Sequence, residues 1–141
     1  MRIIGIDYGT RRIGIALSDP LGLTAYAHTV LQRGKLEAVL QSIQTICTEQ
    51  EVERIVLGLP RNMDGSYGEA AQKVKAFGEQ VEAFTGLPLV YYDERLTTRS
   101  AETILLEADV SRKKRKQVID KVAASYILQA YLDHTRRIGV D

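Results

Sequence analysis

Three acidic residues far apart in this sequence could together bind a cation: Asp7, Glu94 and Asp120. Asp7 is the most unusual, because it interrupts an apolar stretch that reads as a buried hairpin, and a buried carboxylate is costly unless a positive group meets it. Oxygen ligands without His or Cys favour a hard cation such as Mg²⁺ or Mn²⁺. Such a cation orients phosphates and activates water, so the three acids predict phosphoryl chemistry.

Each acid also has an ordinary structural explanation. Asp7 could close a strand and accept turn hydrogen bonds. Glu94 could form a surface ion pair with Arg95 or Arg99, and Asp120 could be a favourable charge in the first turn of a helix. One shared site accounts for all three acids together, so we expect them to be both catalytic residues and metal ligands.

The elements that must position these acids begin with a hairpin. Two apolar runs, Arg2 to Asp7 and Arg12 to Ser18, predict strands joined by a turn at 8–11. Turn residues at 19–22 then lead into a third strand, Leu23 to Leu31. Three consecutive strands predict an antiparallel meander.

The rest of the chain alternates helices with strands. Ser66 and Glu69 have capping-box spacing and predict the start of a helix, whose expected buried stripe is Ala70, Val74, Phe77, Val81 and Phe84. The other expected elements are a helix over about 35–51, a buried strand at 54–58, a strand at 88–92, a helix over about 99–107, a basic loop, and a final helix over about 117–134. This order predicts an α/β fold with a mixed sheet.

The expected topology brings the acids together. A strand that follows the first crossover helix usually pairs beside strand one, which places Asp7 near the centre of the sheet. Glu94 follows the last strand at the same carboxyl-terminal edge. Asp120 lies at the margin of the final helix's apolar stripe, and the small Ala123 and Ala124 would let that helix approach the sheet closely.

Composition limits the possible classes of protein. With 141 residues, 45% of them hydrophobic, residues 1–141 fit a single domain. The net charge of +1 gives no overall basic field. Cys47 lies on an apolar helix stripe with no Cys or His spacing of a zinc site, and we expect it in the core. Since no apolar run reaches the roughly 18 residues of a membrane span, a cytoplasmic protein is expected.

Four ordered motifs carry a resemblance to a known family: Gly5 to Thr10 with Ile13 to Ala16, Val56 to Gly65, Asp93 to Thr98, and Asp120 to Ala124. On these motifs the chain resembles the pre-16S rRNA nucleases, also described as Holliday-junction-resolvase-like proteins of the ribonuclease H-like superfamily. The resemblance implies a ribonuclease H-like five-stranded mixed sheet. It also implies a cytoplasmic metal-dependent nuclease that trims the 5′ end of precursor 16S ribosomal RNA, with ribosomal particles as further partners.

The family's metal-binding acids carry over to Asp7, Glu94 and Asp120. True junction resolvases end in a further acid three residues after the one on the last helix, where this chain has Ala123. The expected strand at 54–58 ends in Gly58 without an acid. Glu94 follows the expected strand at 88–92, which lies one position further from Asp7 in the sheet. Two strand spacings are roughly 9 to 10 Å, so Glu94 must lean inward to share an ion with Asp7.

A second set of residues is expected to bind nucleic acid. Gly58 would admit a nucleic-acid backbone over the sheet edge, although a turn glycine is an alternative. A basic run before Asp120 would hold phosphates, although such runs are often simply solvated. The full set is Thr10, Arg12, Gly58, Asn62, Arg95, Arg112, Lys113, Lys114, Arg115 and Lys116.

Three other functions remain open at this stage. One is a Holliday-junction-type resolvase that acts on structured DNA. Another is a sugar-kinase-like ATPase, because Asp7, Gly9, Thr10 and Gly14 also resemble that superfamily's phosphate-binding hairpin, but 141 residues provide only one of its two lobes. The third is a non-catalytic module that associates with RNA or ribosomes.

Overall fold

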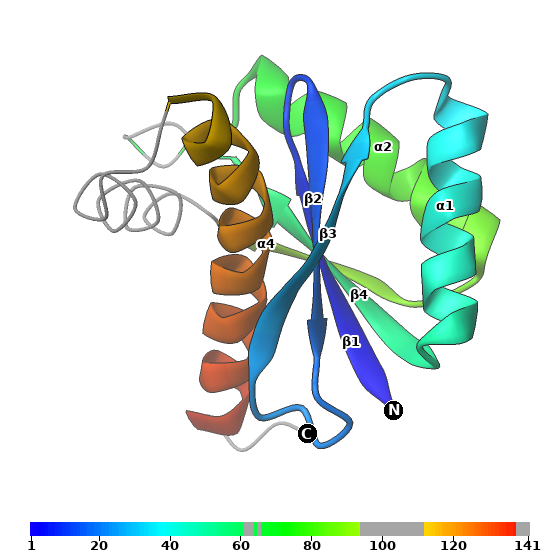
Figure 1. The fold of residues 1–141 in the computed structure, drawn as a ribbon, viewed down its shortest axis with the longest axis vertical. Coiled ribbons are helices and arrows are strands. Elements are labelled where there is room, and N and C mark those ends of the chain that lie inside the picture. The colour runs from blue at the N-terminus through cyan, green and yellow to red at the C-terminus, as the bar shows by residue number, and fades with distance from the viewer. Residues whose placement is uncertain (61–63, 65, 94–111, 138–141) are drawn as a thin grey trace.

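Five strands form one mixed sheet in the computed structural model (Figure 1). The strands are β1 (Arg2–Tyr8), β2 (Arg12–Ser18), β3 (Ala25–Gln32), β4 (Val52–Leu59) and β5 (Leu89–Asp93). Their spatial order is β3-β2-β1-β4-β5, in which β1, β2 and β3 pair antiparallel and β4 is parallel to both β1 and β5. The predicted meander is confirmed, and so is the pairing of β4 beside β1, which makes β1 the central strand.

The structure describes residues 1–60, 64, 66–93 and 112–137, and for 112–121 and 137 only the course of the helix backbone. The helix predicted over 99–107 lies outside these ranges. Within them, no helix is long and apolar enough to cross a membrane.

The third strand begins two residues later than expected because the turn before it has its own hydrogen bonds. The Asp19 carboxylate accepts from the Leu23 and Thr24 amides at 2.7 and 2.9 Å. These bonds hold the pKa of Asp19 below its ordinary value. Gly22, at a φ of 71°, allows the chain to reverse as the turn signals predicted.

Helices α1 (Leu36–Glu49) and α2 (Glu69–Thr85) cover one face of the sheet (Figure 1). This face holds the larger core, whose strand residues are Ile4, Ile6, Ile13, Ile15, Leu17, Val52, Ile55, Leu57 and Leu59. Cys47 lies in this core as expected, and burial raises the pKa of its thiol to about 11.

The start of α2 differs from the expected capping box. Gly68 is the N-cap, while the Ser66 hydroxyl donates to the Asp64 carboxylate at 2.6 Å. The buried stripe uses Ala71, Val74, Phe77, Gly78 and Val81, so the expectation for Ala70 and Phe84 is wrong. Gly78 belongs to the stripe because Tyr91 crosses the helix there: an added Cβ would lie 2.5 Å from the Tyr91 Oη.

Helix α4 (Arg112–Arg137) covers the opposite face (Figure 1). The expected basic loop before it is wrong, since residues 112–116 already belong to the helix; arginine and lysine are good helix formers and continue it without apolar spacing. Within this helix Tyr126 and Ala130 are only half-buried. The second core cluster is Ala16, Val56, Ala124, Ile127, Leu128, Tyr131 and Leu132.

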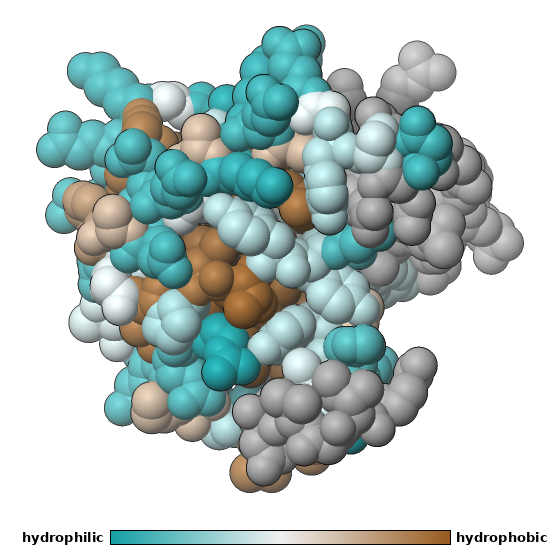
Figure 2. All heavy atoms as spheres, turned by 180° about the vertical axis from the view of Figure 1, so that it is seen from behind, coloured by the Kyte–Doolittle hydropathy of each residue, from teal (hydrophilic) through white to brown (hydrophobic). Residues whose placement is uncertain are grey.

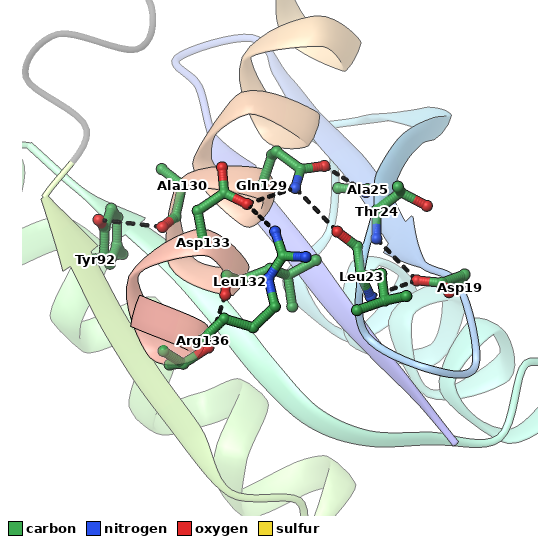
Figure 3. Close-up of polar contacts among 11 residues, drawn as sticks. Asp19, Leu23, Thr24, Ala25, Tyr92, Gln129, Ala130, Leu132, Asp133 and Arg136 are labelled. Atoms are coloured by element: carbon green, nitrogen blue, oxygen red, sulfur yellow. Dashed lines mark hydrogen bonds and ion pairs between the residues drawn. The ribbon is translucent and has the colours of Figure 1, made fainter. Parts of the chain in front are cut away.

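Gln129 fastens α4 to the turn between β2 and β3 (Figure 3). Its Oε1 accepts from the Ala25 amide at 2.8 Å, and its Nε2 donates to the Leu23 carbonyl at 3.1 Å. On the other side of the helix, the Tyr92 hydroxyl donates to the Ala130 carbonyl at 3.4 Å. These bonds fix the position of α4 across the sheet.

Candidate active site

Asp7 is the next-to-last residue of the central strand and is half-buried. Successive side chains of a strand point to opposite faces. Ile4 and Ile6 lie in the core beneath α1 and α2, whereas Ile3 packs against the α4 cluster. Gly5 and Asp7 therefore lie on the α4 face.

Glycines occupy the positions directly beside Asp7. Gly14 of β2 is its partner across the antiparallel pair. The parallel register pairs Ile6 with Leu57, so its continuation by one residue places Gly58 on the other side. The interpretation of Gly58 as a turn glycine is wrong, because it is a buried residue within β4. The positions of the two neighbouring strands that pair directly with Asp7 are therefore both glycines.

Helix α4 lies tightly against β1 at Gly5. A Cβ added to Gly5 would be 2.8 Å from the Leu128 Cβ and 3.2 Å from the Ala124 carbonyl oxygen. Ala124 thus allows the close approach that the sequence predicted, together with Gly5. Each of the two residues is small enough to let the helix and strand backbones approach.

The direction of α4 places position 120 toward the carboxyl end of β1. Tyr131 and Leu132 belong to the cluster against which Ile3, near the start of β1, packs, so the helix runs antiparallel to the strand. Position 120 lies about one turn before Ala124 along the helix backbone, and Asp7 lies two residues beyond Gly5. The helix begins at Arg112, so the interpretation of Asp120 as a first-turn charge is wrong.

The other predicted site residues are placed only in part. Thr10 is exposed in the hairpin turn and Arg12 begins β2, both at the Asp7 end of the sheet. The backbone of 112–116 forms the first turns of α4. Glu94, Arg95 and Asn62 lie outside the described residues. In the described ranges no group of three or more His, Cys, Asp or Glu could hold a metal, and the side chains of Glu94 and Asp120 lie outside those ranges.

Sequence reasoning missed a stack of side chains at the hairpin. The Tyr8 ring stacks on Phe77 of α2 with centroids 4.0 Å apart, and the Arg33 guanidinium lies 4.2 Å above the Tyr8 ring centroid. The only signal in the sequence was an aromatic residue directly after Asp7. Arg33 itself gave none, because its partners lie more than 20 residues away.

A cavity of about 420 Å³ lies at the opposite end of β1 from Asp7. Its lining includes Met1, Leu21, Arg54 and Thr135, and none of the predicted site residues. The candidate site is therefore a surface at the sheet edge and not this cavity.

Figure 2 shows the rear of the molecule, where apolar side chains gather near the middle with hydrophilic ones around them.

Solved structures with the same fold define the class. Thermus thermophilus RuvC in complex with a Holliday junction substrate matches with a TM-score of 0.58 at 15% identity, over 99% of this chain and 96% of that chain. The fowlpox virus resolvase in complex with Holliday junction DNA matches with a TM-score of 0.55 at 11% identity, over 95% and 98%. The chain has the ribonuclease H-like fold of these proteins, as expected.

Sequence comparison defines the family. A protein of Moorella thermoacetica named "Putative pre-16S rRNA nuclease" is 53% identical over 99% of this chain and 100% of its own length. One of the same name from Syntrophomonas wolfei is 53% identical over 94% of both chains. Residues 1–134 match the family described as RuvX: Holliday junction resolvase, and the chain belongs to that family. This membership excludes the sugar-kinase-like alternative.

Proposed function

We propose that this chain is a cytoplasmic, metal-dependent nuclease that processes the 5′ end of precursor 16S ribosomal RNA. The observation that carries the proposal is the position of Asp7, on the central strand between two glycines and beneath the helix that bears Asp120. The names of relatives about half identical over nearly the whole chain support the choice of substrate.

In this proposal Asp7, Glu94 and Asp120 hold Mg²⁺ or Mn²⁺. The donor set fits such an ion, because carboxylates are hard ligands and the half-buried Asp7 is rigidly fixed by the sheet. When bound, the ion would polarise the scissile phosphate and generate a nucleophilic water. Asp7 sits on a paired strand and position 120 within a helix, which supports the proposal because sites on strands and helices are more precise than sites on loops.

The phosphate backbone would be held at the same end of the sheet by Thr10, Arg12, Gly58, Asn62, Arg95 and the basic run at 112–116. Five consecutive helical residues cover more than one full turn, so the cations of the run cannot all face one strand of nucleic acid. The run would therefore supply only some of its charges to phosphates. Ribosomal particles are the expected partner, and residues 1–141 would act as one nuclease domain.

A cleavage assay tests this function. Purified protein is incubated with a 5′-extended 16S precursor fragment, a mature-end fragment and a four-way DNA junction, each with Mg²⁺, with Mn²⁺ and with chelator. We expect metal-dependent cleavage of the precursor near the mature 5′ end. Preferred cleavage of the junction would favour the resolvase alternative, and binding of RNA without cleavage in either metal would favour a non-catalytic module.

A further inference from the structure

Arg33, which follows β3, holds the hairpin turn that directly follows Asp7. One arm of its guanidinium, Nη1, donates to the carbonyl oxygens of Gly9 and Thr10 at 3.0 and 3.2 Å. The other, Nη2, donates to the Tyr8 hydroxyl at 2.6 Å. Its own amide donates to the Arg11 carbonyl at 3.1 Å. A single side chain and its backbone thus contact all four residues of the turn.

The contacts lead back to Asp7 through Gly9. The Gly9 amide donates to the carbonyls of Asp7 and Arg12 at 3.1 and 3.0 Å, while the Gly9 carbonyl accepts from Arg33. The Tyr8 ring is held by stacking contacts, between the Arg33 guanidinium and the Phe77 ring. The peptide that bonds to Asp7 and the residue next to Asp7 are therefore both fixed by Arg33.

We propose that Arg33 is a positioning residue for the Asp7 site, acting through the turn 8–11 and not through contact with substrate. This inference rests on the proposed function, because it assumes that Asp7 carries the chemistry. The planar guanidinium matters more than the charge, because Nη1 donates to two carbonyls and Nη2 to the Tyr8 hydroxyl while the same plane lies over the Tyr8 ring. Lysine at this position would keep the charge and lose the planar guanidinium with its two donor nitrogens.

The test compares Arg33→Lys and Arg33→Gln with Lys35→Gln, which removes a nearby exposed charge. Cleavage of the precursor fragment should show kcat lowered by about 10-fold or more in both Arg33 variants, since small displacements at a reacting centre are costly. KM and its salt dependence should stay unchanged. The metal concentration for half-maximal activity should rise, and Lys35→Gln should behave as wild type.

Amide exchange of Gly9, followed by NMR below the unfolding temperature, reports on the turn independently of cleavage. We expect faster exchange in both Arg33 variants than in Lys35→Gln, and equal rates would overturn the proposal. Full rescue of kcat by Arg33→Lys, or a reduced salt slope of binding, would instead make Arg33 a phosphate contact. Asp7→Asn separates the role of Arg33 from the proposed function. If Asp7→Asn remains active, the proposed function fails. If Asp7→Asn is inactive while both Arg33 variants are fully active, only the role of Arg33 fails.

Discussion

The two faces of the sheet are built from different residues. Toward α1 and α2 the three central strands present isoleucine and leucine almost without exception, and these side chains are fully or nearly fully buried. Toward α4 the same strands present Ile3 and Val56 beside a larger number of small and polar residues: Gly5, Asp7, Gly14, Ala16, Ser18, Arg54 and Gly58. The face toward α1 and α2 buries a large apolar area, and the other face brings helix α4 close to the strand that bears Asp7.

This difference separates stability from chemistry. Apolar burial is the main source of folding free energy, so the face beneath α1 and α2 should supply most of it. The α4 face gives up some of that area. The close contact between the backbones of α4 and β1 at Gly5 instead brings the helix that bears Asp120 over the strand that bears Asp7. Changes on the two faces should therefore affect different measurements.

Asp7→Asn should have the largest effect, and only on activity. Loss of a ligand charge should lower metal-dependent cleavage by at least about 100-fold, because substitutions that merely support metal ligands already cost 10–100-fold. The melting temperature should change little, since the amide has the same size. Asp19→Asn is the control: it changes an aspartate in the β2–β3 turn and should leave cleavage unchanged. Full activity of Asp7→Asn would contradict the site.

Ile6→Ala, one residue away on the opposite face, should have the reverse effect. Ile6 is fully buried, so truncation should cost about 2–5 kcal/mol of unfolding free energy, measured with denaturant. Ile6→Val should cost about 0.5–1.5 kcal/mol at the same place. Cleavage per folded molecule should remain close to wild type. A loss of activity as large as that of Asp7→Asn would show that the faces are not separable.

Gly5→Ala should affect both stability and activity. The added Cβ meets a Cβ and a backbone carbonyl of α4, neither of which is the flexible end of a side chain, so the helix must shift. Overpacking of this kind costs about 1–3 kcal/mol. Displacement of α4 should also lower kcat. Gly34→Ala is the matched control, because an added Cβ there meets nothing within 4 Å.

Neutralising the basic run should have the smallest effect. With Ala at Lys113, Lys114 and Lys116, the slope of log affinity against log salt should fall by up to about 2, because the helix cannot turn every charge toward phosphates. A matched variant with Ala at Lys35, Lys73 and Lys75, which lie on or beside the helices of the other face, should keep the wild-type slope. Equal slopes in all three proteins would remove the run from the interface.

Periodicity predicted most of this fold. Apolar runs bounded by turn residues predicted the strands of the meander, and the crossover rule placed Asp7 on the central strand. The start of α4 could not be predicted in this way, because the basic run at 112–116 has no apolar positions. The α2 stripe was misjudged at Gly78, since its contact with Tyr91 comes from another element. The predicted roles of Asp7, Glu94 and Asp120 stay predictions.

The glycines beside Asp7 show a further limit of sequence reasoning. Gly58 looked like a turn residue, and only the register of β4 beside β1 shows that it neighbours Asp7. Arg33 shows the same limit more strongly, because its bonds go to backbone carbonyls of a turn far earlier in the chain. Contacts that depend on register and on backbone acceptors leave no pattern in residue types.

Paramagnetic broadening by Mn²⁺ tests most directly whether the α4 face holds the metal. Amide signals are followed in wild type and in Asp7→Asn as Mn²⁺ is added. We expect Gly5, Asp7, Gly14 and Ala124 to broaden first, well before Val39 of α1 and Val74 of α2, and this selectivity to disappear in Asp7→Asn. Strongest broadening at another surface, or the same pattern in both proteins, would contradict the account.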